Sequence, residues 1–311
     1  MERVSPVRES TEGGQGGGDA ALSPLASPLI VTCAITGDHS PQSHSALPVS
    51  ASEQAAAAEA ATAAGAAIVH VHGRDPRDHS RPASEVHHYT AIADAIRQRV
   101  PEAIVDFTQS AAPVVDGENL FRYTALAVDA APDMMSLNPG PMTFRAGPGR
   151  PSSAVISTFE DTARIATLLR SRGVKPQVFL YHPGHLDLLE YLIERDVLEP
   201  PYWLQLVFGQ QSGMPAAPEM LLFMVKNLPT GSVFQACGVG RASIEAGLLS
   251  LLLGGHVRTG MEDALEYRPG EPVVDNAQLV SRVVRFATDL GRPIATAAQT
   301  RAMIGLADPS N

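Results

Sequence analysis

The sequence predicts a parallel, eight-stranded (β/α)8 barrel of the TIM type, and two observations carry that prediction. Eight short runs rich in β-branched and other apolar residues alternate with longer stretches whose apolar residues recur at helical spacing. This alternation indicates a parallel sheet with both faces covered, and eight strands in roughly 280 residues favour a closed barrel. An open doubly wound sheet would have a Gly-x-Gly-x-x-Gly turn after its first strand, where this chain has Thr36-Gly37-Asp38-His39.

The elements follow in order after a leader. Residues 1–27 contain a glycine run that has nothing to bury, so they are expected to be a disordered leader, with residues 28–311 forming the catalytic barrel. The predicted strands are 29–36, 67–72, 103–108, 134–138, 177–182, 202–208, 232–239 and 256–259. The predicted helices are 53–64, 88–99, 159–172, 186–195, 218–227, 244–253, 276–290 and 297–304.

The composition of the chain argues against several classes of binding partner and cellular location. The formal net charge of −10 argues against a nucleic acid or an anionic membrane held by general electrostatics. The sequence has no apolar stretch of transmembrane length and no basic-then-apolar signal peptide. The two cysteines, Cys33 and Cys237, each lie in an apolar run, as free buried cysteines do. A cytoplasmic protein that acts on small molecules is therefore expected.

The second predicted strand carries a candidate metal site. It contains His70 and His72, whose side chains point to the same face because strand side chains alternate. At the end of a barrel strand that face is the interior, where two imidazoles can reach one metal ion. The alternative is a pair of buried histidines bonded to neighbouring backbone.

A third ligand is expected after the eighth strand. A catalytic zinc site uses three protein ligands and an open position. Glu262 and Asp263 follow a glycine turn, with Arg258 shortly before them. The alternative is a surface loop or the acidic first turn of a helix.

Short motifs along the whole barrel occur in one order that is typical of a known family. They are TCAITG (32–37), HVH (70–72), MSLN (135–138), QLVFG (205–209), GVGR (238–241), GGHVR (254–258), GMED (260–263) and GRPIAT (291–296). With them, residues 29–306 resemble the β-keto acid cleavage enzymes. The resemblance implies a (β/α)8 barrel with one Zn²⁺ per subunit that condenses a β-keto acid with acetyl-CoA. It also implies acetoacetate and a new acyl-CoA as products, and a homo-oligomer, expected to be a tetramer.

The resemblance also implies roles for individual residues. His70, His72 and Glu262 would bind zinc, and Arg258 and Asp263 would form the catalytic pair. Two hydroxyl residues, Thr108 and Ser136, would contact the substrate. Arg241, after the seventh strand where barrels often bind phosphate, is a candidate contact for a CoA phosphate, against the alternative of an ordinary turn.

The sequence departs from the family in two places. Gln177 and Phe179 occupy alternate positions that are acidic in the aminohexanoate enzyme of the family, where one acid supports the catalytic pair. His182 is a weak substitute, since a satisfied core histidine is the better interpretation. His39, beside Asp38, aligns with a glutamate that faces the ammonium group of that enzyme's substrate. A histidine suits a neutral or anionic side chain better, so a different β-keto acid is expected.

Two other functions remain open at this point. An amidohydrolase-type zinc hydrolase also uses a His-x-His pair, although usually on the first strand of the barrel and with more histidines. A zinc-binding barrel that binds a small acid without catalysis is the non-enzymatic alternative.

Overall fold

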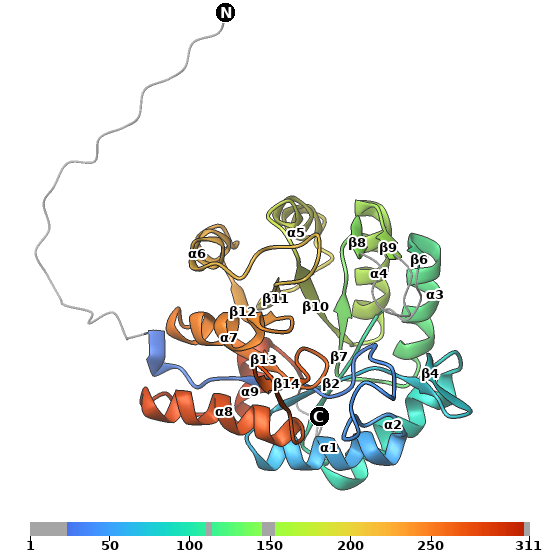
Figure 1. Ribbon diagram of the computed structural model, residues 1–311. Coiled ribbons are helices and arrows are strands. Elements are labelled where there is room, and N and C mark those ends of the chain that lie inside the picture. Colours follow the sequence, from blue (N-terminus) through green and yellow to red (C-terminus); the bar gives the residue numbers. More distant parts are fainter. Residues whose placement is uncertain (1–23, 110–113, 145–152, 308–311) are drawn as a thin grey trace, which may run out of the picture.

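The computed structural model describes residues 24–109, 114–144 and 153–307, and these form a closed parallel barrel surrounded by helices (Figure 1). Around the barrel the strand order is β1-β13-β12-β11-β10-β7-β5-β2. The eight strands are β1 (Val31–Ala34), β2 (Ile68–Val71), β5 (Ile104–Phe107), β7 (Met134–Leu137), β10 (Lys175–Leu180), β11 (Tyr202–Phe208), β12 (Ser232–Gly238) and β13 (His256–Thr259). The predicted fold class is confirmed, and each predicted strand overlaps one of these eight.

The barrel strands are short, apolar and buried on both faces, as parallel strands between a core and a helical layer must be. Their register sets the depth of each interior side chain. His70 of β2 pairs with Ala34 of β1 on one side and with Asp106 of β5 on the other. Two polar residues that are distant in sequence, His70 and Asp106, therefore lie side by side on adjacent strands.

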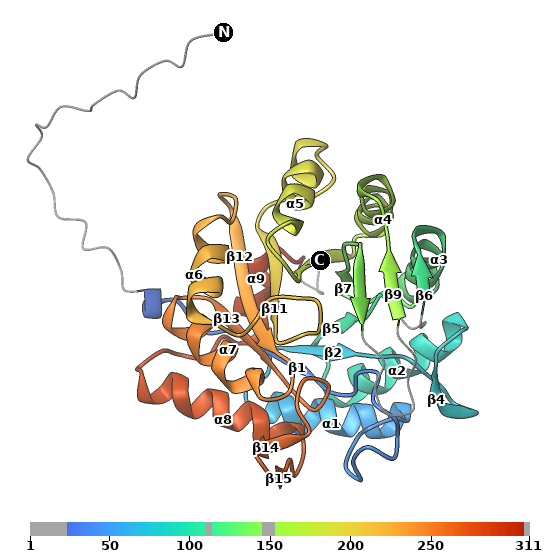
Figure 2. The ribbon, with the colours of Figure 1, turned by 45° about the horizontal axis from the view of Figure 1, so that its top comes forward.

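The helices cover the outside of the barrel (Figures 1 and 2). They are α1 (Ala51–Ala63), α2 (Val86–Arg99), α3 (Gly117–Val128), α4 (Phe159–Ser171), α5 (His185–Glu194), α6 (Pro218–Lys226), α7 (Ala242–Leu252), α8 (Asn276–Asp289) and α9 (Ala297–Ile304). Each predicted helix overlaps one of them. The sequence analysis missed α3, which begins with a glycine and contains the β-branched Thr124 and Val128, all poor helix formers. Packing of its buried Leu120 and Ala127 overrides that weak local preference.

Small sheets extend the loops around the barrel. β3 (Arg74–Asp75) and β4 (Asp78–Pro82) form a hairpin after β2, and β14 (Glu266–Arg268) and β15 (Glu271–Pro272) form another after β13. A third sheet has the order β6 (Val114–Asp116), β9 (Ser153–Ile156), β8 (Met142–Phe144). The first two hairpins flank the two segments that carry the candidate metal ligands.

Part of the predicted leader lies within the described residues. Pro24–Ala26 form a short 3-10 helix (η1), and the carbonyl of Ser27 accepts a hydrogen bond from the Arg292 guanidinium at 3.0 Å. Residues 1–23 lie outside the part of the chain that the structure describes. Both cysteines, Cys33 and Cys237, are buried and free. Among the described helices, none combines the length and the apolar character that crossing a bilayer requires.

Candidate metal centre and active site

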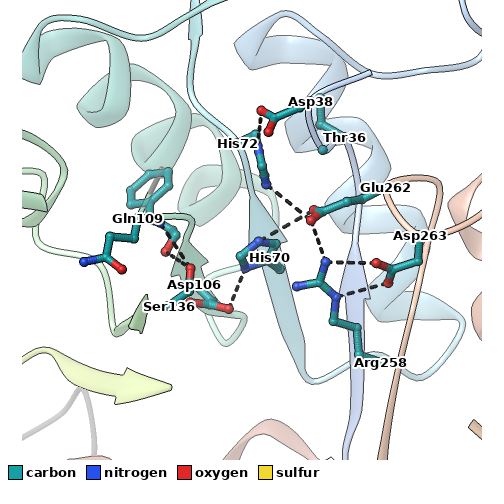
Figure 3. Close-up of polar contacts among 12 residues, drawn as sticks. Thr36, Asp38, His70, His72, Asp106, Gln109, Ser136, Arg258, Glu262 and Asp263 are labelled. Carbon is teal, nitrogen blue, oxygen red and sulfur yellow. Dashed lines mark hydrogen bonds and ion pairs between the residues drawn. The ribbon is translucent and has the colours of Figure 1, made fainter. Parts of the chain in front are cut away.

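Two segments at the carboxyl end of the barrel bring the three predicted ligands together (Figure 3). His70 is the third residue of β2, and His72 follows one residue after the strand ends, so both rings point to the interior. Glu262 comes from the loop after β13. That loop is fixed against β1, because Glu262 N donates to the Ala34 carbonyl at 3.1 Å. Gly260 has φ 144°, and a Cβ there would lie 2.1 Å from the same carbonyl oxygen, so this approach requires glycine.

The ligand atoms converge on one point. His70 Nε2 lies 3.6 Å from Glu262 Oε2, and His72 Nε2 lies 3.3 Å from Glu262 Oε1. One atom from each of the three residues lies within 4.8 Å of the others, a spacing that one metal ion can bridge. Both histidines are buried, but their ring nitrogens contact the carboxylates of Asp106, Asp38 and Glu262, so they are not core histidines bonded only to backbone.

Each imidazole has a carboxylate partner at Nδ1, which leaves Nε2 as its candidate metal-binding atom. His70 Nδ1 is 2.7 Å from Asp106 Oδ2, and His72 Nδ1 is 2.9 Å from Asp38 Oδ1. Because an ionised carboxylate only accepts, each Nδ1 carries a proton, and Nε2 is the ring atom that can bind a metal when the imidazole is neutral. Glu262 Oε2 is buried and accepts no hydrogen bond from any described residue. These donors fit a divalent ion such as zinc.

The electrostatics also favour a cation. Burial opposes protonation of His72, but Glu262 and Asp38 outweigh it and raise its pKa to about 10. Burial likewise opposes ionisation of Glu262, but Arg258 and the two histidines hold its pKa well below the usual range. The site therefore attracts positive charge between His72 and Glu262, which a bound metal ion would supply in place of a proton.

Arg258 and Asp263 form a paired group beside the ligands. Arg258 Nε and Nη2 donate to the two oxygens of Asp263, each at 3.0 Å, and Nη2 also donates to Glu262 Oε1 at 2.5 Å. Burial raises the pKa of Asp263 above its ordinary value, although Arg258 pulls it down. A buried carboxylate with a raised pKa, fixed in orientation by a guanidinium, is suited to accept a proton from a bound substrate.

The two predicted substrate hydroxyls lie on neighbouring strand ends. Thr108 directly follows β5 and is half-buried. Ser136, in β7, is buried, and its hydroxyl accepts from the backbone N–H of Gln109 at 3.1 Å and donates to the Phe107 carbonyl at 3.4 Å. The Ser136 hydroxyl thus joins two barrel strands, which is a structural use of a group expected to contact substrate.

The loop after β1 carries Asp38 and His39. Asp38, whose side chain is 54% exposed, is bonded to a candidate metal ligand, a contact that the sequence analysis did not foresee. His39 Nε2 lies 2.9 Å from the carbonyl of Glu262, so this nitrogen carries a proton and donates. Arg74 donates to the carbonyls of Gly37 and His39 and so fixes the loop.

Arg74 and Asp106 are the polar residues of the site that sequence reasoning missed. The signal for Asp106 was present, because a charge inside the apolar run of β5 requires a partner in the barrel. Arg74 follows the His-x-His pair directly, but nothing in its local sequence shows that it turns back to the loop after β1.

Phe179 and Gln177, the two residues at positions that are acidic in the aminohexanoate enzyme, contact different parts of the site. The Phe179 ring centre lies 5.7 Å from the Arg258 guanidinium carbon and 6.3 Å from the centre of the His70 ring, so it lies next to the Arg258–Asp263 pair. Gln177 lies two residues earlier in β10 and reaches Asp106 instead. His185 is a buried histidine whose Nδ1 accepts from the Tyr181 N–H at 3.1 Å, while its Nε2 has no hydrogen-bond partner among the described residues. Arg241 is exposed and directly precedes α7.

Comparison with known proteins agrees with this geometry. The model of the beta-keto acid cleavage enzyme family matches residues 28–306. The chain is 32% identical over 280 residues to the 3-keto-5-aminohexanoate cleavage enzyme of Fusobacterium nucleatum, covering 89% of this chain and 98% of that protein. It is 30% identical over 286 residues to the 3-oxoadipate:acetyl-CoA acetyltransferase of Cupriavidus necator, covering 91% and 96%.

Solved structures support the fold. The binary complex of ObcA with oxaloacetate superposes with a TM-score of 0.70 at 22% identity, over 84% of this chain and 68% of that one. Because the family model spans nearly the whole barrel, including His70, His72 and Glu262, the chain belongs to the β-keto acid cleavage enzyme family.

Proposed function

We propose that this protein exchanges acyl groups between a β-keto acid and acetyl-CoA at a bound divalent metal ion. The observation that carries the proposal is the convergence of His70, His72 and Glu262 beside the Arg258–Asp263 pair. The relative from Cupriavidus necator, named as an acetyl-CoA acetyltransferase of 3-oxoadipate, supports the choice of acyl donor. No redox step is required, because the reaction only exchanges acyl groups.

His70, His72 and Glu262 would hold the metal, and zinc is the preferred ion because two imidazoles and a carboxylate form a common catalytic zinc set. Bound there, a divalent ion would act as a Lewis acid toward the ketone and carboxylate oxygens of the keto acid. Manganese and cobalt also accept such ligands, so metal content must be measured.

In the exchange, a bond forms between C2 of the keto acid and the acetyl carbonyl carbon, and the acetyl C–S bond breaks to release the CoA thiolate. The bond between C2 and the original ketone carbon then breaks, and the CoA sulfur ends on that ketone carbon. The products are acetoacetate and the new acyl-CoA. Asp263 accepts the C2 proton, and its raised pKa suits a base that must later return a proton. Arg258 holds both oxygens of Asp263 in place.

The remaining predicted residues bind the two substrates in this proposal. Thr108 directly follows β5 and Ser136 is the third residue of β7. Both would contact the carboxylate end of the keto acid, Ser136 by turning its hydroxyl proton away from the Phe107 carbonyl. Arg241, exposed at the start of α7, is available to a CoA phosphate. Positioning acetyl-CoA against C2 is the main contribution of these groups, since proximity alone can supply a large part of the rate.

The preferred keto acid has a neutral or anionic side chain. His39 offers a donor rather than a carboxylate, and its ring is tied to the Glu262 carbonyl. Asp38, a nearby carboxylate that could receive an ammonium group, is already bonded to His72. Phe179 adds an apolar ring beside the catalytic pair.

Three further expectations from the sequence and the family resemblance belong to this proposal. The protein is cytoplasmic, it forms a homo-oligomer that we expect to be a tetramer, and its leader spans residues 1–27. Size-exclusion chromatography with light scattering tests the second.

Acetyl-CoA with a ¹³C-labelled acetyl group tests the function. Zinc-loaded protein is offered amino, neutral and dicarboxylic β-keto acids, and mass spectrometry follows labelled acetoacetate, the product common to all of them. We expect labelled acetoacetate from neutral or dicarboxylic substrates, and its loss in His72→Ala and Asp263→Ala. Metal-loaded wild type that forms none from any substrate contradicts the proposal, and a preference for the amino substrate contradicts the role given to His39.

A further inference from the structure

Below the metal centre, polar side chains form a continuous buried network through the barrel. We call Thr32, Gln177, Gln205 and Gln235 the interior amide network; all four are 0% exposed. Thr32 Oγ1 donates to Gln235 Oε1 at 2.7 Å, and Gln235 Nε2 donates to Gln205 Oε1 at 2.7 Å. These contacts cross from β1 to β12 and β11, so the barrel interior at this depth is polar rather than aliphatic.

Gln177 connects this network to the metal centre. Its amide oxygen must face Trp203 Nε1 and Gln235 Nε2, because an indole N–H and an amide NH2 group can only donate. In that orientation the oxygen accepts from these atoms at 2.6 and 2.7 Å, and the amide nitrogen donates to Asp106 Oδ2 at 3.3 Å. The same Asp106 oxygen accepts from His70 Nδ1 at 2.7 Å.

We propose that Gln177 is a positioning residue of the metal centre, which it serves by holding the carboxylate that orients His70. This inference rests on the proposed metal site. Asp106 is 0% exposed, and its other oxygen, Oδ1, has no hydrogen-bond partner among the described residues. Gln177 and His70 are thus the two side chains that fix the Asp106 carboxylate through Oδ2.

The consequence follows from geometry. Without Gln177, Asp106 keeps its bond to His70 but loses the contact that sets its own rotation, and the His70 ring turns with it. A zinc ligand must present its lone pair within a narrow range of angles, so a small rotation of His70 lowers affinity. Trp203 and Gln235 donate to the Gln177 amide oxygen, so the amide group that holds Asp106 is itself fixed in orientation.

Gln205 provides a matched control within the same network. It is equally buried, and it accepts from Gln235 and donates to the Leu206 carbonyl at 3.1 Å. These hydrogen bonds of Gln205 do not reach Asp106 or a candidate metal ligand. Replacing either glutamine by leucine removes buried amide bonds of the same kind, but only the change at Gln177 releases Asp106.

The test compares zinc binding in wild type, Gln177→Leu and Gln205→Leu. Apo protein is titrated with zinc against a chromophoric chelator, and thermal unfolding of each apo protein reports the general cost of each change. We expect both variants to melt at lower temperature. Gln177→Leu should weaken zinc binding by about tenfold, the lower end for groups that support a ligand, while Gln205→Leu should leave it unchanged. Gln177→Met serves as a second variant if the leucine variant does not fold.

A second readout follows His70 itself. In zinc-loaded wild type, long-range ¹H–¹⁵N spectra should show His70 as the Nδ1–H tautomer, and Gln177→Leu should broaden or shift that signal. Equal zinc affinity in Gln177→Leu and wild type would overturn the inference while leaving the metal centre intact. Wild type that binds no zinc would instead contradict the proposed function.

Discussion

The two candidate histidine ligands have the same partner chemistry but opposite surroundings. His70 is supported by Asp106, which is fully buried between barrel strands and bonded to the interior amide network. His72 is supported by Asp38, which lies on a loop with its side chain 54% exposed. Each pair positions an imidazole through a carboxylate, but one is held by packing and the other by a loop.

This difference divides the site into two parts. We call His70 with Asp106 the fixed half, and the loop that carries Asp38 and His39 the adjustable half. The strand register holds Asp106 beside His70, so that pair cannot move without disturbing the barrel. The loop of Asp38 and His39 is held mainly by hydrogen bonds from Arg74 and by the contact between His39 and the Glu262 carbonyl. Substitutions in that loop can change substrate preference without loss of the fold, since loops tolerate change better than core strands.

The largest expected effect tests the buried pair. Asp106→Asn keeps the shape of the side chain but removes the charge that polarises His70, in a site where water cannot replace it. We expect the zinc dissociation constant to rise by about 100-fold, the upper end for a supporting group. Chelator competition measures it, with thermal unfolding as the check on folding. A change below threefold would show that the buried carboxylate does not support the metal ligand.

A smaller loss of zinc affinity is expected when the exposed pair, Asp38 and His72, is disrupted. Asp38→Asn removes the same charge from His72, but water reaches this position and can accept the Nδ1 proton. We expect zinc affinity to fall by about tenfold, the lower end of the same range. The comparison fails if Asp38→Asn weakens zinc binding as much as Asp106→Asn does in the same competition assay.

Removing the hydrogen bonds that hold the adjustable half should lower zinc affinity by less than either change above. Arg74→Met removes the donors to the Gly37 and His39 carbonyls while keeping an apolar stem of similar length. We expect the free energy of unfolding to fall by about 2 kcal/mol, as for lost hydrogen bonds to a buried charge. Zinc affinity should fall by less than in Asp38→Asn. A loss of zinc affinity greater than that of Asp106→Asn would show that the loop, and not the barrel, fixes the site.

His256 is a buried histidine without a carboxylate partner among the described residues, in contrast to His70 and His72. Its effect is expected in the pH dependence of the free energy of unfolding. His256 is 3% exposed, its Nδ1 accepts from the Ile30 N–H at 3.0 Å, and burial together with Arg292 lowers its pKa to about 3. Because this folded-state pKa lies below the unfolded value of about 6.5, the stability contributed by neutral His256 is present above pH 6.5. It is lost as the pH falls from 6.5 toward 3, by roughly 1 kcal/mol per pH unit.

Urea unfolding of the metal-free protein at pH 7.5 and 5.5 measures this effect. His256→Gln keeps an acceptor for Ile30 but cannot take up a proton, so this variant should lose less stability than wild type between the two values. Carboxylates titrate alike in both proteins, and their contribution cancels in the difference. Equal losses would show that His256 is not held neutral by the fold.

Much of the fold could be predicted from the sequence because barrel strands and outer helices have distinct apolar periods. The eight strands from β1 to β13 were predicted on that basis and are confirmed. Helix α3 was missed because its residues have low helical preference and its stability comes from packing of Leu120 and Ala127. The small sheets around the barrel were also missed. Strands β3, β4, β14 and β15 consist mostly of polar residues and lack the apolar runs that marked the barrel strands.

The site could be predicted in part for similar reasons. His70 and His72 share a face through strand alternation, and the family motifs implied Glu262, Arg258 and Asp263; the structure brings all five together. The charge of Asp106 inside an apolar strand signals a buried partner, but the partner cannot be identified from the sequence. The contact of Asp106 with Gln177 depends on barrel register between non-adjacent strands. The role of Asp38 behind His72 depends in the same way on how the loop after β1 folds back.

The central claim is that acyl exchange occurs at a metal ion held by His70, His72 and Glu262. The most direct measurement strips the metal with a chelator and follows labelled acetoacetate while zinc is added back. We predict no product from the apo protein and full activity at one equivalent of zinc per subunit. In His72→Ala, one equivalent should restore nothing. Undiminished product from metal-free wild type, or equal recovery in His72→Ala, would contradict the account.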